Sequence, residues 1–172
     1  DRGVRFRFKG ASISEALVVD CGFALQLARA AATLRSLGVD EFEHVGTYNY
    51  RCIGGGSPPG CRLSAHARGR ALDFSAFTAG STTWSVARDF VTRRHRDTTP
   101  TCATPRVNEA DRSLKEMACA FHERGAFRIV LTPNHDEAHR DHFHVDFDDP
   151  PADAVRARME GVDPPAGGAT ES

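Results

Sequence analysis

Arg70-Ala-Leu-Asp-Phe-Ser-Ala-Phe77 and His142-Phe-His-Val-Asp-Phe147 are the two stretches that decide the fold. Both have the period of two that is expected of a strand buried on one face. In the second stretch the apolar residues share one face, whereas His142, His144 and Asp146 share the other. The apolar face predicts a core strand, and the polar face indicates a site.

The first stretch divides its residues between two faces in the same way. Leu72, Phe74 and Ala76 fall on one side, and Ala71, Asp73 and Ser75 fall on the other. If the two strands are neighbours, Asp73 can face His144. His66 lies seven residues before Asp73, and a turn at Gly69 would return its ring to the same face. A His, an Asp and a His leave one tetrahedral position open, as a catalytic zinc site requires.

Outward from these stretches, the pattern alternates between helices and short strands. We expect helices over residues 15–37, 84–94 and 108–124, strands over 42–50, 70–77, 127–131 and 142–147, and weakly extended chain over 1–14. Helices between non-adjacent short strands predict an α+β fold, with a small, mainly antiparallel sheet flanked by helices. We expect one domain over 1–150, and a short helix at 152–159 followed by a disordered tail within 151–172.

Composition and charge narrow the class of protein. The chain has 172 residues, 40% of them hydrophobic, and a formal net charge of -1. This near-neutral balance gives no basis for nucleic-acid binding. No apolar run approaches the roughly 20 residues of a membrane span. The chain begins at Asp1, so we expect a processed product whose leader is out of view.

The five cysteines suggest the redox environment. Cys52 and Cys61 flank a Gly/Pro-rich loop that a disulfide would close, and Cys102 and Cys119 are a second plausible pair. We expect Cys21 to stay buried and reduced. Disulfides indicate an oxidising compartment. The alternative is five unlinked thiols in a cytosolic protein.

The sequence that leads into the first of these stretches carries a recognisable motif. Ser64-Ala-His-Ala-Arg-Gly-Arg-Ala-Leu-Asp73 has the form Ser-x-His-x-x-Gly-x-Ala-x-Asp. It resembles the signature of the LAS metallopeptidases, which include D-Ala-D-Ala carboxypeptidases, lysostaphin-type endopeptidases and the hedgehog fold. In that group the His and the Asp bind zinc, and a later His-x-His supplies the third ligand. The resemblance therefore implies His66, Asp73 and His144 as ligands of Zn²⁺.

Two families within this group are similar to the chain. The stretches 46–52, 63–67 and 139–146 resemble the extensin-like C-terminal family, although its Cys-Arg pattern is reversed here to Arg51-Cys52. His139-Arg-x-His142-x-His144 resembles the penicillin-insensitive murein endopeptidases, whose active site includes the first two histidines.

The resemblance also implies roles for residues around the zinc. Asp141, three residues before His144, matches the general base, and His142 remains a second candidate. Arg51 matches an anion clamp for a substrate carboxylate or an oxyanion. Ser64 lies outside any Gly-x-Ser-x-Gly elbow, so we expect it to bind substrate with Tyr50 and not to act as a nucleophile.

The implied function is a zinc peptidase that acts on peptidoglycan stem peptides or cross-links. One alternative is a non-catalytic, zinc-containing module that binds the cell wall. Another is a metal-dependent nuclease, which the near-neutral charge disfavours. A periplasmic or secreted location follows, including delivery as a toxin, whose partner would be an inhibitor or immunity protein of unknown identity.

Overall fold

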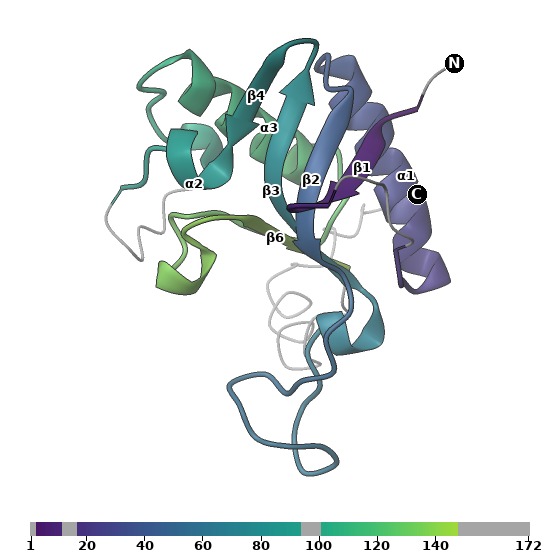
Figure 1. Ribbon diagram of the computed structural model, residues 1–172. Coiled ribbons are helices and arrows are strands. Elements are labelled where there is room, and N and C mark those ends of the chain that lie inside the picture. Colours follow the sequence, from purple (N-terminus) through teal and green to yellow (C-terminus); the bar gives the residue numbers. More distant parts are fainter. Residues whose placement is uncertain (1–2, 12–16, 94–100, 148–172) are drawn as a thin grey trace, which may run out of the picture.

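The computed structural model describes residues 3–11, 17–93 and 101–147, which form a six-stranded sheet and its flanking helices (Figure 1). The strands are β1 (Arg5–Phe8), β2 (Glu41–Gly46), β3 (Ala71–Ala79), β4 (Thr82–Ser85), β5 (Ile129–Leu131) and β6 (Phe143–Asp146). The α-helices are α1 (Cys21–Ser36), α2 (Val86–Asp89) and α3 (Glu109–Glu123). Three 3-10 turns complete the elements: η1 (His66–Arg68), η2 (Thr101–Ala103) and η3 (Glu137–His139).

The sheet is mixed, with the strand order β1-β2-β3-β6-β5. Four of its five pairings are antiparallel, and β1 alone runs parallel to its neighbour, β2. Helix α1 forms the crossover between these two strands, which returns the chain to the same end of the sheet, as parallel pairing requires. The α+β fold class and the mainly antiparallel sheet are therefore confirmed, with one parallel pair that the sequence pattern did not predict.

The central strand, β3, joins the halves of the sheet and carries Asp73. Its first half pairs with β6, where Asp73 lies directly opposite His144, as expected. On the β2 side the register shifts, so that Ser75 is the extra residue of a β-bulge. As a result Phe74 and Phe77, three residues apart, both enter the core, whereas regular alternation placed Ala76 there.

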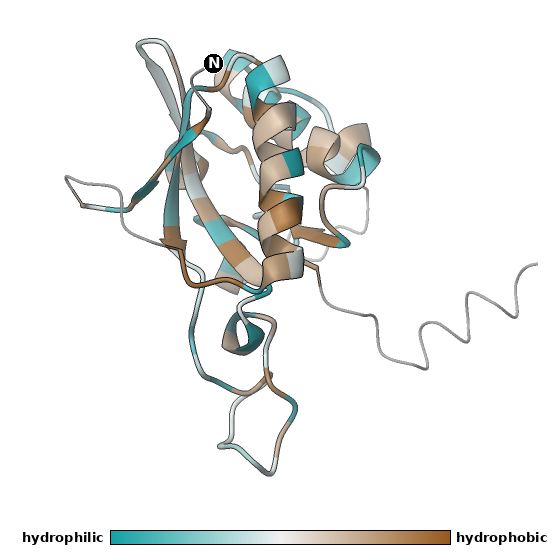
Figure 2. Cartoon of the chain, turned by 90° about the vertical axis from the view of Figure 1, so that its right-hand side faces the viewer, coloured by the Kyte–Doolittle hydropathy of each residue, from teal (hydrophilic) through white to brown (hydrophobic). Residues whose placement is uncertain are grey.

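The core is rich in aromatic rings, which pack in stacked and edge-to-face pairs between the sheet and its two long helices. Phe74 lies at its centre, with ring centroids 4.9 Å from Phe42 and 5.3 Å from Phe121. Helix α1 lies along the sheet, and the segment after β2 projects away from its end (Figure 2). Asp20 and Asn108 cap α1 and α3 by accepting hydrogen bonds from the first backbone N–H groups.

Three predicted boundaries were wrong. The helix expected over 84–94 is reduced to α2, because Trp84 lies in β4 and pairs with Phe77. Threonine and tryptophan favour a strand where a partner edge is present, and the second half of β3 provides that edge. Helix α1 begins six residues later than the predicted 15, after its cap at Asp20. The strand predicted over 42–50 is β2, which ends at Gly46.

Four of the cysteines pair as expected, but the surroundings of the fifth differ from the prediction. The disulfides Cys52–Cys61 and Cys102–Cys119 are both present. Cys21 is free but exposed, so the prediction of a buried thiol was wrong. It is the first residue of α1 and lies off the buried face of that helix, which begins at Phe23. The two disulfides fit an extracellular or secreted protein. The helix at 152–159 and the tail predicted within 151–172 lie outside the described residues.

A search of the described residues found no helix with the length and apolar character needed to cross a membrane.

Candidate metal centre

Three elements bring the three predicted metal ligands together. Asp73 on β3 and His144 on β6 are cross-strand partners. His66 comes from η1, immediately before β3, and Gly69 ends that turn in the left-handed region with φ 65°. A Cβ at Gly69 would also lie 3.0 Å from the backbone nitrogen of Asp20. The positive φ and the lack of space for a Cβ therefore both require glycine here, where the chain returns His66 to the sheet.

The donor atoms of the triad form a nearly equilateral triangle. His66 Nε2 lies 3.2 Å from His144 Nδ1 and 3.3 Å from Asp73 Oδ1, and His144 Nδ1 lies 2.9 Å from Asp73 Oδ1. Tetrahedral zinc with bonds of 2.0–2.1 Å separates its ligand atoms by about 3.3 Å. The three side chains therefore have both the chemistry and the spacing that one zinc ion would require.

Acceptors outside the triad orient both histidine rings. His66 Nδ1 donates to the carbonyl oxygen of Thr47 over 3.0 Å, so its Nε2 faces the triad. His144 Nε2 donates to Asp146 Oδ2 over 3.3 Å, so its Nδ1 faces the triad. Such outer acceptors are typical of metal-binding histidines, since they set the tautomer and the ring orientation. Asp146 therefore belongs to the site as the residue that orients His144.

The charges of the triad suit a cation. Burial opposes ionisation of Asp73, but hydrogen bonds from His144 and His66 outweigh it and hold the pKa of Asp73 well below its usual range. Burial also disfavours the charged form of His144, yet its bonds to Asp146 and Asp73 raise the pKa of His144 to about 9. Without a metal, His144 is therefore protonated at neutral pH, and a bound cation would replace that proton.

Two further histidines stand beside the triad. His142 Nε2 lies 3.7 Å from Asp73 Oδ1, and its Nδ1 donates to Asp141 over 2.9 Å. Asp141 is thus on the outer side of His142, and its side chain is 47% exposed. His139 Nδ1 donates to Asp136 over 2.6 Å. Burial lowers the pKa of His139, and the hydrogen bond with Asp136 opposes this shift.

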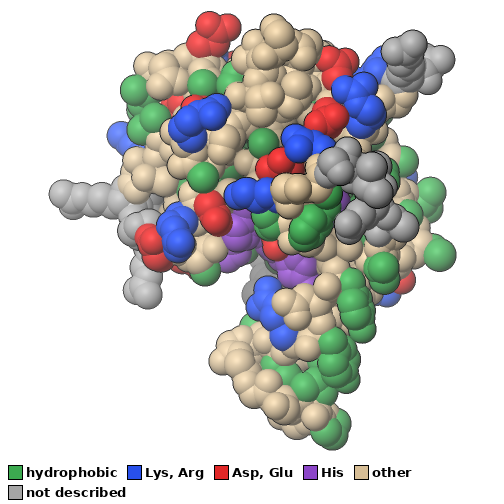
Figure 3. Space-filling model, in the orientation of Figure 1, with side chains coloured by type: hydrophobic (Ala, Val, Ile, Leu, Met, Phe, Trp, Pro, Cys, Tyr) green, Lys and Arg blue, Asp and Glu red, His purple; other side chains and the backbone are tan. Residues whose placement is uncertain are grey.

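The triad forms the floor of an open cleft of about 420 Å³. His139 and His142 line the cleft on one side, and the segment that projects after β2 lines it on the other. Figure 3 shows histidines at the junction between the body of the protein and this projecting segment. A smaller hollow of about 120 Å³ adjoins the triad and shares Arg51, His66 and Asp73 with the cleft.

Of the remaining predicted site residues, two line the cleft and one does not. Arg51 is exposed and lines the cleft. Ser64 also lines the cleft, but it is buried, and its Oγ accepts a hydrogen bond from Ala67 N at the start of η1. The side chain of Tyr50 is 60% exposed and lines neither the cleft nor the smaller hollow.

Sequence reasoning missed two side chains of this site. Asp136 precedes His139 by three residues, the spacing of a helix cap, and it caps η3 while it orients that histidine. Arg62 lines the cleft and follows Cys61, much as Arg51 precedes Cys52 across the loop. Both signals were present in the sequence, but neither is specific until the fold places the residues.

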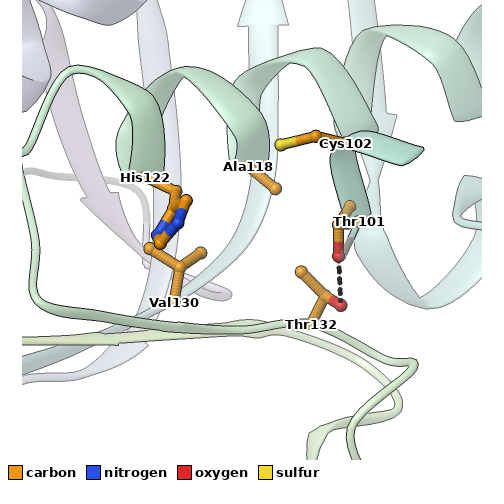
Figure 4. A pocket seen from close by; sticks show the side chains of 6 residues that line it. All are labelled: Thr101, Cys102, Ala118, His122, Val130 and Thr132. Atoms are coloured by element: carbon orange, nitrogen blue, oxygen red, sulfur yellow. Dashed lines mark hydrogen bonds between the residues drawn. The ribbon is translucent and has the colours of Figure 1, made fainter. Parts of the chain in front are cut away.

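A second group of potential ligands does not compete with the triad. Cys102, Cys119 and Glu123 have donor atoms within 4.8 Å of one another, but the two sulfur atoms form a disulfide. A hollow of about 150 Å³ lies beside it, and Figure 4 shows His122 and two threonines in its lining. The hydroxyls of Thr101 and Thr132 are hydrogen-bonded to each other over 3.1 Å, so they are satisfied without a ligand.

Fold and site together define an α+β domain with a His-Asp-His triad at the floor of an open cleft. The family model described as Extensin-like protein C-terminus matches residues 4–155, so the chain belongs to this family. Comparisons with curated proteins and with solved structures found no match.

Proposed function

We propose that this protein is a zinc-dependent peptidase that hydrolyses amide bonds in peptidoglycan stem peptides or cross-links. The observation that carries the proposal is the triangle of donor atoms from His66, Asp73 and His144, which opens into a cleft large enough for a peptide. A closed structural zinc site would have a fourth protein ligand, whereas a catalytic one keeps that position open. The sequence motifs around the triad resemble those of the LAS peptidases, which supports the same conclusion.

The bound metal would supply a Lewis acid that polarises the amide carbonyl and lowers the pKa of a water molecule to about 7. Of the groups that can accept a proton, His142 is best placed, since its Nε2 lies 3.7 Å from a triad oxygen. Asp141 would act through His142, because its carboxylate accepts from the other ring nitrogen and would stabilise the charged imidazole. The pair would then return the proton to the leaving amine.

The neighbouring residues would position the substrate and stabilise charge. Arg51 lines both the cleft and the smaller hollow, so it can reach an anionic group close to the reacting carbonyl. His139 lines the cleft, and Asp136 holds the ring through Nδ1, which leaves Nε2 for contact with the substrate. Peptidoglycan lies outside the cytoplasm, so a periplasmic or secreted location fits both this substrate and the two disulfides.

The test measures zinc and cleavage in the same preparations. The full chain should bind one zinc per molecule by elemental analysis and release peptides from purified muropeptides, with product masses that identify the bond. Asp73→Ala and His144→Ala should lose both zinc and cleavage. His142→Gln should keep zinc and lose cleavage. Arg29→Ala, on the exposed side of α1, is the matched control and should change neither.

Two outcomes would contradict the proposal. If the wild-type chain bound no zinc, the proposed zinc-dependent activity would lose its basis. A zinc-loaded chain that binds cell wall but leaves muropeptides intact after long incubation would instead identify a non-catalytic binding module.

A further inference from the structure

The projecting segment, residues 51–64, is a two-stranded arm whose register is set by its backbone. Cys52 and Leu63 form an isolated antiparallel bridge. On either side of that bridge, Ile53 N donates to Arg62 O over 2.9 Å, and Ser64 N donates to Arg51 O over 3.0 Å. In an antiparallel ladder alternate residues share a face. Arg51, Ser64, Ile53 and Arg62 therefore lie on one face of the arm.

That face of the arm is a wall of the cleft, because all four of these residues line it. The disulfide Cys52–Cys61 closes the loop and limits how far the two strands can separate. In Figure 3, Lys and Arg side chains lie on the upper part of the arm, next to the histidines of the metal centre.

The two arginines of this wall have no ion-pair partner in the part of the chain that the structure describes. Both are exposed, and neither forms an ion pair with another described residue. Their positions are diagonal across the ladder, a relation that places residues about 7–8 Å apart. Two like charges at that separation repel each other, and an anion between them would relieve the repulsion. A guanidinium also matches a carboxylate with two parallel hydrogen bonds.

The two arginines differ in their distance from the triad along the arm. Arg51 pairs with Ser64, two residues before His66. The Ile53–Arg62 pair lies two residues farther out, roughly 7 Å at 3.3–3.4 Å per residue. That length equals about two residues of an extended peptide. A group bound by Arg62 would therefore belong to a part of the substrate beside the reacting amide, not to the amide itself.

We propose that Arg62 is the specificity-determining residue of this cleft, and that with Arg51 it selects peptides that carry a free carboxylate within about two residues of the scissile bond. This inference rests on the proposed peptidase function for its substrate. Its geometry rests on the arm's register and on two arginines that form no ion pair with another described residue. It predicts that the protein discriminates between a carboxylate and a carboxamide on otherwise identical stem peptides.

The test uses two muropeptides that differ only in whether the side carboxyl groups next to the cross-link are free or amidated. The zinc-loaded full chain should prefer the free acid by about 10- to 100-fold in kcat/KM, the range of a charge-assisted hydrogen bond. Arg62→Gln should bring the ratio close to one by lowering kcat/KM for the free acid. Arg62→Lys should restore part of the preference, because it keeps the charge but loses the paired hydrogen bonds. Arg29→Ala should keep the wild-type ratio.

Equilibrium binding of the same two peptides separates this inference from the proposed function. Cleavage of both peptides at equal rates, or an unchanged preference in Arg62→Gln, would overturn the role of Arg62 and leave the peptidase proposal standing. Absence of cleavage, with tighter binding of the free acid that Arg62→Gln abolishes, would overturn the peptidase proposal and support the role of Arg62. Equal binding of both peptides without cleavage would overturn both.

Discussion

Replacement of Asp146 by alanine tests whether the triad is a metal centre, because it changes the triad without removing a ligand. Asp146 accepts from His144 Nε2 over 3.3 Å, and the side chains of both residues are at least 87% buried. A charge-assisted bond of this kind contributes about 1.5–3 kcal/mol. The distance is at the long end of the hydrogen-bond range, so we take the lower half, roughly 1.5–2 kcal/mol. Zinc affinity should therefore fall about 10- to 30-fold, within the range known for such outer partners.

The assay is competition for zinc with a chromophoric chelator, alongside urea unfolding of the metal-free chains to check the fold. Asp136→Ala is the matched control, because Asp136 orients His139 in the same way but His139 is not part of the triad. This control variant should keep a zinc affinity within about threefold of the wild-type value. Asp146→Asn should fall between the alanine variant and the wild type, since an amide oxygen can still accept the bond. Equal losses in Asp136→Ala and Asp146→Ala, or no loss in Asp146→Ala, would refute the assignment of His144 as a ligand.

Three further predictions concern stability. Gly69→Ala should cost about 2–3 kcal/mol in urea unfolding, because φ 65° is unfavourable for alanine and its Cβ would meet the backbone of Asp20; a loss below about 0.5 kcal/mol would contradict the strained turn. Lys115→Met should cost about 3–5 kcal/mol, because it leaves the fully buried carboxylate of Asp111 without the ammonium 2.8 Å away; a neutral result would show that this charge is compensated elsewhere. The metal-free chain should lose stability as pH rises from about 6.5 through 9, by at most about 3 kcal/mol. The sign follows because the pKa of His144 is raised to about 9 in the folded state, so its contribution is complete below the unfolded value and is lost above the folded one. Unfolding measured in a chelator over this window should show the decline, and a flat or rising curve would count against the protonated His144.

Much of the triad could be predicted from local sequence because strands have a fixed period. Residues two apart on β6 share a face, so His144 and Asp146 had to point the same way. A glycine followed closely by a strand predicted the turn that returns His66. The pairing of Asp73 with His144 required that β3 and β6 be neighbours in this register, which the structure confirms. The resemblance of the motifs added the expectation of a metal.

The features of the sheet that the sequence did not predict depend on hydrogen bonds between strands. The bulge at Ser75, which brings Phe74 and Phe77 to one side, depends on the register that β2 adopts against β3. The strand at Trp84 formed because β3 offered it an unpaired edge, which outweighed a helical pattern in the isolated segment.

The sequence by itself determined which side chains could meet at the candidate metal centre, because their spacing is a local property of a strand and a turn. Only the tertiary structure decided what surrounds them. It placed Asp141 behind His142, so that the carboxylate reaches the triad through the ring. It also folded the arm so that Arg62 faces the cleft. Both arrangements depend on contacts between segments distant in sequence or on the path of a loop, which no local period encodes.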